Sequence, residues 1–335
     1  MPVEVPVIHH HLVHKESGTR RIAYKQLGGL EAKHLFVCLP GLLETQDSFD
    51  LLWSQVTDFE HCCWISLDYC GRGYSDPLPE DQNYSTSVYL ADIEDLISAL
   101  SSRPSRDANQ KIHFIGTSMG GILAMYLAHR QKVKAHSLIL NDIGASLHWS
   151  SLMALYQQIK HSEHKLDLLS IDPRAVNAVH TTAHFDLAYE YDLFGMQFHT
   201  LLNAYHGKII LLHNSHSRIC PLTVAEQSKK RLPQMEVWTQ YGVEHPATWD
   251  AAMVAKLGRT LKLKKYSTQP PQASMQAPQP ETAAPARHEP AMDLIPFMEN
   301  SKKYMESPEP ESLSMNWTGK LLSKLKKLLN FRSNK

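Results

Sequence analysis

Ser118 lies in the pattern that most directly suggests chemistry. Gly116-Thr117-Ser118-Met119-Gly120 has the form G-x-S-x-G, and it stands between an apolar run that predicts a strand and one that predicts a helix. A tight strand-to-helix turn with small neighbours can lift a serine hydroxyl off the sheet. The start of the following helix favours negative charge that develops beside it. We therefore expect Ser118 to act as a nucleophile.

His245 is the histidine best placed to activate this serine. It lies in YGVEHPATW, after the last predicted strand and before the last predicted helix. Loops at the carboxyl ends of parallel strands share one edge of a sheet, so His245 can reach a serine on a neighbouring strand. The chain holds 20 histidines, and the alternative interpretation is a histidine in a surface loop.

Short apolar runs alternate with helical patterns and would position both residues. Runs this apolar are typical of parallel strands that are buried on both faces. Apolar residues spaced three and four apart predict helices over 86–100 and 119–130. The alternation predicts an α/β fold with a doubly wound, mostly parallel sheet. The predicted strands are 34–39, 62–68, 111–115, 136–141, 208–213 and 234–240.

Two further strands, 7–14 and 20–26, should form an antiparallel edge of the sheet. The first of them carries His9, His10, His11 and His14. No cysteine or carboxylate pattern accompanies these histidines, so a polar edge strand is favoured over a metal site.

Composition divides the chain into three regions. We expect a folded domain over 1–265, and a Pro-rich, disordered linker over 266–290 that lacks large apolar side chains. A separate tail covers 291–335, and an amphipathic helix is predicted at about 317–331. From Trp317 onwards the tail contains Lys and Arg but no Asp or Glu, with Leu and Trp on one arc of that helix. This pattern favours reversible binding to an anionic membrane surface, and docking on a protein is the alternative.

Charge and cysteine content narrow the class of protein. Lys plus Arg and Asp plus Glu are both 34, so the net charge is zero and a nucleic-acid partner is not expected. The five cysteines form no CxxC pair, which favours buried free thiols in a reducing compartment. With no signal-peptide pattern, we expect a cytoplasmic protein, peripheral at a membrane if the tail binds one. The sequence leaves the oligomeric state open.

Five motifs in order give the chain a resemblance to the α/β-hydrolase fold superfamily, closest to its soluble esterase and C–C hydrolase branch. The resemblance covers about residues 20–260 and implies acyl transfer from a small acyl substrate to water through an acyl-serine, without metal or cofactor. The motifs are LPGLLETQDSFDLLW, LDYCGRGYSDP, GTSMGG, LILNDIG and GVEHP.

The resemblance implies a role for four residues. Ser118 would be the nucleophile and His245 the general base. The backbone N–H groups of Leu42 and Met119 would form the oxyanion hole. The segment from Asp68 to Asp76 resembles a loop that is structural in the family, and it receives no catalytic role. An acyltransferase or a C–C hydrolase has the same residues and remains an alternative.

Two positions depart from the family pattern. Pro40-Gly41 stands where His-Gly is common, which changes how the oxyanion loop is braced. Arg218 stands where the family usually has the acid that orients the histidine, and a guanidinium cannot accept a hydrogen bond. Asp142, at the end of the preceding strand, is the best substitute, with Glu244 a weaker candidate. Because of Arg218, a catalytically impaired α/β-hydrolase-like scaffold or interaction protein is the alternative to an enzyme.

A lid is expected between the predicted strands, at about 145–205. This region contains two or three short helical patterns and many aromatic residues, which would line an apolar acyl site. Covering the edge of the sheet is the alternative role for these side chains.

Overall fold

A computed structural model of the chain describes residues 6–265, with gaps at 16–17, 43, 58, 80–81, 83, 105–106, 108, 148–150, 152–196 and 243–244. Contacts divide the chain into two compact units, 1–270 and 271–335. The predicted linker, the tail with its amphipathic helix, and most of the expected lid lie outside the described residues. The membrane role of the tail therefore stays a sequence-based prediction. No helix among the described residues is long and apolar enough to span a membrane.

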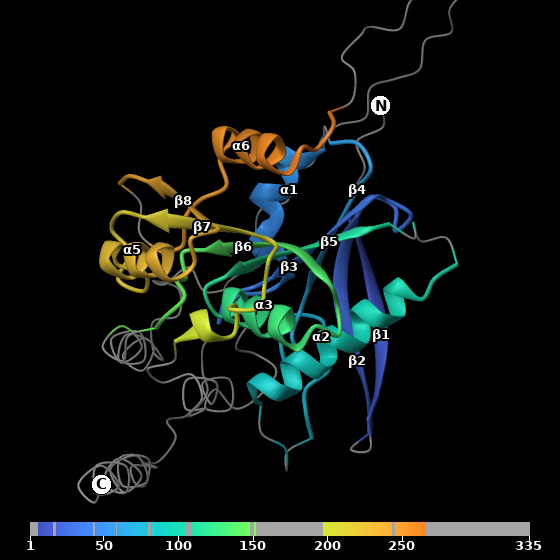
Figure 1. Cartoon of the computed structure of the whole chain (residues 1–335). Helices are drawn as coiled ribbons and strands as arrows, with labels where there is room; N and C mark the ends of the chain where they lie inside the picture. The colour runs from blue at the N-terminus through green and yellow to red at the C-terminus, as the bar shows by residue number, and fades with distance from the viewer. Residues whose placement is uncertain are drawn as a thin grey trace, which may run out of the picture. The chain divides into compact units, whose positions relative to one another are not determined.

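Eight strands form one sheet in the order β1-β2-β4-β3-β5-β6-β7-β8 (Figure 1). β1 and β2 pair antiparallel and β2 joins β4 antiparallel, whereas all other neighbours are parallel. The prediction of a mostly parallel sheet with an antiparallel edge is confirmed. The strands are β1 Val7–Lys15, β2 Gly18–Leu27, β3 His34–Leu39, β4 Cys62–Leu67, β5 Lys111–Thr117, β6 Ala135–Asn141, β7 Lys208–Asn214 and β8 Met235–Gln240.

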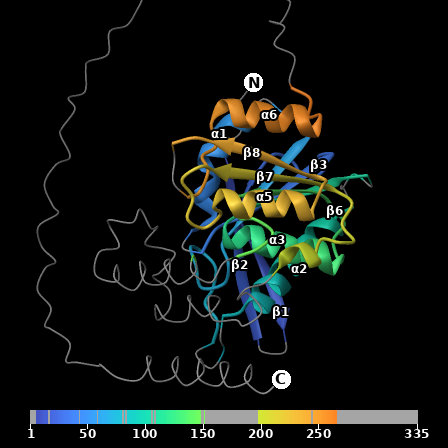
Figure 2. The same cartoon turned by 60° about the vertical axis from the view of Figure 1, so that its left-hand side comes forward.

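Helices cover both faces of the sheet (Figure 2). α2 (Thr86–Ser101), α3 (Met119–Arg130) and α5 (Leu222–Arg231) bury their apolar residues in one core, and α1 (Asp50–Val56) and α6 (Ala251–Leu261) bury theirs in the other. Two 3₁₀ turns, η1 (Gln46–Phe49) and η6 (Phe198–Thr200), complete the described elements. The double layer explains why strands such as β4 are apolar at nearly every position.

All five cysteines are buried free thiols, as the sequence predicted.

The parallel strands place their carboxyl ends at one edge of the sheet, which we call the carboxyl edge. Leu39, Thr117, Asn141, Asn214 and Gln240 are the last residues of β3, β5, β6, β7 and β8. Loops that follow these residues can bring side chains together, even when they are far apart in the sequence.

Two histidines, the half-buried His34 and the buried His113, lie together at the opposite end of the sheet. His34 Nδ1 is 2.9 Å from His113 Nε2, and His113 Nδ1 is 2.7 Å from Ser137 Oγ. Burial lowers the pKa of His34 to about 4 and that of His113 well below its ordinary value, and the nearby Lys111 adds to both shifts. Both imidazoles are therefore neutral in the folded protein at pH values where exposed histidines are charged.

From these two neutral histidines we expect the protein to lose stability in mild acid. Below about pH 6.5, His34 and His113 bind protons in the unfolded protein but stay neutral in the folded one. The free energy of unfolding therefore falls as the pH drops from about 6.5 towards 4. We expect a loss of about 2–3 kcal/mol between pH 7 and pH 5, measured by urea unfolding. His113→Gln should flatten the pH dependence and His10→Gln, at an exposed position, should not. An unfolding midpoint independent of pH would contradict the prediction.

Candidate active site

Ser118 occupies a strained turn between β5 and α3. Its φ of +50° and ψ of −114° lie outside the regions that residues with a side chain usually adopt. The turn is held by a hydrogen bond from the Ser118 N–H to Asn141 O at 3.0 Å. A Cβ on Gly116 or Gly120 would come within 2.3 Å or 2.0 Å of backbone atoms. The glycines of G-x-S-x-G therefore permit a turn in which the half-buried Ser118 stands at the carboxyl edge.

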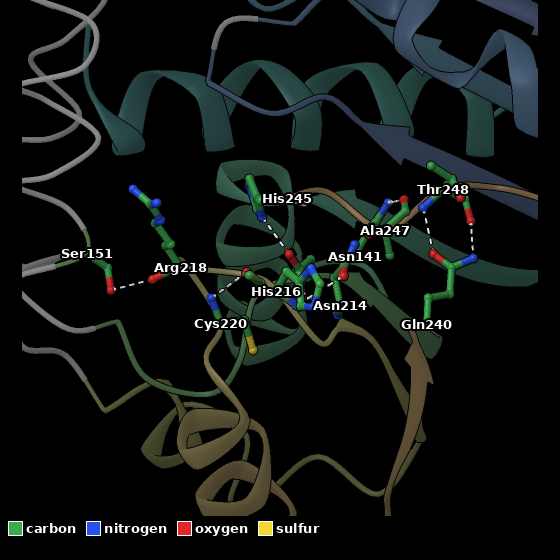
Figure 3. Close-up of polar contacts among 12 residues, drawn as sticks. Asn141, Ser151, Asn214, His216, Arg218, Cys220, Gln240, His245, Ala247 and Thr248 are labelled. Carbon is green, nitrogen blue, oxygen red and sulfur yellow. Dashed lines mark hydrogen bonds and ion pairs between the residues drawn. The ribbon is translucent and has the colours of Figure 1, made fainter. Parts of the chain in front are cut away.

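Asp142 and His245 meet at the same edge. Asp142 Oδ2 lies 2.8 Å from His245 Nδ1, although 103 positions separate the two residues in the sequence. Asp142 Oδ1 accepts a second hydrogen bond, from the Asn214 N–H at 2.9 Å. Figure 3 shows the His245 ring above the end of β7, where these contacts converge.

The environment of Asp142 suits an acid that orients a histidine. Its side chain is fully buried, and its φ of +55° turns the chain sharply at the end of β6. An ionised carboxylate that accepts the Nδ1–H of an imidazole leaves the lone pair on Nε2, which can then remove a proton from a hydroxyl. The structure thus brings together two of the predicted site residues. Their catalytic roles stay predictions.

Arg218 stands where the family usually has the acid. Arg218 lies on the loop after β7, and its side chain is exposed. Its backbone oxygen accepts a hydrogen bond from Ser151 Oγ at 2.7 Å. In Figure 3 the guanidinium of Arg218 points to the same side of these loops as the His245 ring. Glu244, the weaker candidate, lies outside the described residues.

The predicted oxyanion donors stand at the ends of two adjacent strands. Met119 begins α3 and is buried, and Leu42 is half-buried on the loop after β3. No residue in the described part of the chain accepts the Leu42 N–H or the Met119 N–H. The two amides remain candidates for the oxyanion hole.

The Asp68–Asp76 loop makes contacts that the sequence analysis did not predict. Its side chains reach the loop after β3 as well as their own turn. Tyr69 Oη donates to Pro40 O at 2.9 Å, and Arg72 Nη1 donates to Gly41 O at 3.0 Å. Asp68 Oδ1 accepts the Gln46 N–H at 2.7 Å. This network braces residues 40–42, the predicted oxyanion loop, in which Pro40 stands where a histidine is common in the family.

Glu44 is a residue of the site that sequence reasoning missed. Its Oε2 accepts the Gly41 N–H at 2.6 Å. Burial raises the pKa of the Glu44 carboxyl, although the Gly41 N–H, His245 and Arg72 all favour its charged form. A glutamate three residues after the glycine of an oxyanion loop was the available signal. Within the described ranges, no group of three or more His, Cys, Asp or Glu could hold a metal ion.

Comparisons with known proteins concern the fold and part of the sequence. The family described as alpha/beta hydrolase fold matches residues 34–165. A 3-hydroxybutyrate-oligomer hydrolase from Cupriavidus necator is 33% identical over 132 residues, which are 39% of this chain and 42% of that relative. The match therefore spans less than half the length of the relative. The description of the family and the name of the relative both refer to hydrolases.

Solved structures show the same fold. An alpha/beta hydrolase from Novosphingobium aromaticivorans is similar with a TM-score of 0.58 and 20% identity, over 76% of this chain and 98% of that one. An esterase from Exiguobacterium antarcticum is similar with a TM-score of 0.59 and 18% identity, over 75% of this chain and 98% of that one. Together with the order of the strands and the turn at Ser118, these similarities lead to one conclusion: the chain is an α/β-hydrolase fold protein.

Proposed function

We propose that the protein is a serine hydrolase that cleaves esters through an acyl-serine intermediate. The observation that carries the proposal is the hydrogen bond between the buried Asp142 and His245, at the edge of the sheet where Ser118 occupies its strained turn. The scaffold alternative was suggested by Arg218, which stands at the usual position of the acid. The contact between Asp142 and His245 supports the enzyme instead, because it offers an acid from another position.

The steps follow from the roles of the three residues. His245 removes the proton of Ser118 Oγ as the oxygen attacks the ester carbonyl carbon, and the N–H groups of Leu42 and Met119 receive the negative oxygen. The imidazolium returns the proton to the leaving alcohol as the C–O bond breaks. Water then repeats the sequence on the acyl-serine, releasing the acid and free Ser118.

The substrate class that we propose is short oligoesters of hydroxy acids. The support is the similarity to a hydrolase of 3-hydroxybutyrate oligomers. The test is incubation of the full chain with the 3-hydroxybutyrate dimer, with the monomer measured by chromatography. We expect release of monomer that stops after treatment with a fluorophosphonate, which modifies activated serines. Release that persists after complete labelling would overturn the proposal, and so would inertness towards both the dimer and simple p-nitrophenyl esters.

Arg218 offers a prediction about the same substrates. A 3-hydroxybutyrate oligomer ends in a carboxylate, which a guanidinium at the carboxyl edge can pair with. Because Arg218 is exposed, the gain is modest, and Arg218→Gln should raise KM for the dimer about three- to tenfold. KM for p-nitrophenyl butyrate, which has no charge, should stay the same. Lys230→Gln, which removes an exposed charge from α5, is the control. Equal changes for both substrates would contradict the prediction.

A further inference from the structure

Two successive peptide groups of the oxyanion loop are held by side chains. The first joins Pro40 to Gly41. Its C=O accepts the hydroxyl of Tyr69 at 2.9 Å, and its N–H donates to Glu44 Oε2 at 2.6 Å. The second joins Gly41 to Leu42, and its C=O accepts Arg72 Nη1 at 3.0 Å and the Glu44 N–H at 3.4 Å. Three of the four polar ends therefore have partners, and the fourth is the Leu42 N–H.

The shared peptide gives Arg72 a direct route to the candidate oxyanion donor. The carbonyl that Arg72 holds and the N–H of Leu42 belong to the same planar group, so fixing one fixes the direction of the other. A hydrogen bond from a cation to the carbonyl also polarises that peptide, which makes its N–H a stronger donor.

The surroundings of Arg72 strengthen this effect. The side chain is fully buried, with its guanidinium 5.2 Å from the Tyr69 ring centre and 5.5 Å from that of Tyr89. A positive charge removed from water acts more strongly on nearby groups than an exposed one. Tyr69 itself is buried, so its ring and hydroxyl have little freedom to move.

We propose that Tyr69, Arg72 and Glu44, the oxyanion-loop clamp, are positioning residues that aim and polarise the Leu42 N–H towards the negative oxygen of the transition state. The proposal rests on the proposed serine hydrolase function. It extends the role of the Asp68–Asp76 loop, which the sequence presented as structural. None of the three side chains needs to touch the substrate, because each acts through the backbone of residues 40–42.

The test compares turnover with binding of a transition-state mimic. An aryl trifluoromethyl ketone forms a negative oxygen when a serine adds to it, so its inhibition constant reports on the oxyanion hole. Arg72→Gln should lower kcat for p-nitrophenyl butyrate about 10- to 100-fold and weaken the ketone by a similar factor, with KM nearly unchanged. Arg72→Lys keeps the charge and should lose less. Tyr69→Phe removes one hydroxyl and should lose about two- to tenfold in both quantities.

Controls separate positioning from folding. Tyr205→Phe also removes a buried tyrosine hydroxyl, one for which no described residue is a hydrogen-bond partner, and it should change neither quantity. If thermal melting shows that the Arg72 variants do not fold, Tyr69→Phe decides alone. The inference is overturned if kcat falls while the affinity for the ketone stays at the wild-type value, or if neither changes. Wild-type protein without any esterase activity would instead refute the proposed function.

Discussion

Ser118→Ala is expected to remove nearly all turnover of p-nitrophenyl butyrate, about 10⁴- to 10⁶-fold in kcat. The reason is that alanine has no hydroxyl to form the acyl intermediate, so only binding and the oxyanion hole continue to assist attack by water. Labelling by a fluorophosphonate should disappear together with turnover. Both are measured on the full chain, by absorbance and by intact mass.

Ser102→Ala is a matched control, because Ser102 is exposed beyond the end of α2 and its hydroxyl donates to Ala99 O, away from the candidate site. It should label and turn over like the wild type. Labelling of folded Ser118→Ala would show that another serine is the reactive one. A wild type that neither labels nor turns over would favour the non-catalytic scaffold.

Asp142→Asn is the second change with a large expected effect, a fall in kcat of about 10²- to 10⁴-fold. An amide nitrogen at the position of Oδ2 cannot accept the Nδ1–H of His245, so the imidazole would present its N–H rather than its lone pair to Ser118. The contact with the Asn214 N–H survives if the amide oxygen takes the place of Oδ1, and the fold should persist. Circular dichroism and the rate of ester hydrolysis measure the two outcomes.

Glu244→Gln provides the comparison, because it neutralises the carboxylate next to His245 in the sequence. We expect it to cost far less than Asp142→Asn. The reverse order of effects would make Glu244 the orienting acid and leave Asp142 as a residue that braces the end of β6.

The sequence predicted those parts of the fold that have a clear apolar pattern. Strand 34–39 and helix 119–130 were predicted with the bounds that the structure shows, because each is mostly apolar and ends at a clear break. No ranges were predicted for α1 or α5. α1 has only seven residues, and α5 buries little besides Val224 and Ala225. Such short or polar helices gain their stability from tertiary packing, which periodicity does not report.

The site was predictable to the extent that local motifs describe it. The G-x-S-x-G pattern identified the turn at Ser118, and the strand order placed Asp142 within reach of His245. Two features were not predictable. One is the hydrogen bond from the backbone N–H of Asn214 to Asp142, and the other is the contact of Tyr69 and Arg72 with the oxyanion loop. They depend on how two loops pack against each other, and residue types alone do not specify this packing.

The position of the acid has a consequence for how this chain can diverge. Asn214, the last residue of β7, holds the Asp142 carboxylate through its backbone N–H, and every residue except proline supplies such a group. The exposed side chains at 216 and 218 are therefore not needed to hold Asp142, although both residues lie on the loop that follows Asn214. Substitutions at these two positions can change the substrate preference while Asp142 and His245 keep their contact. A library randomised at these two positions, with 214 kept free of proline, is a natural starting point for changing specificity by directed evolution.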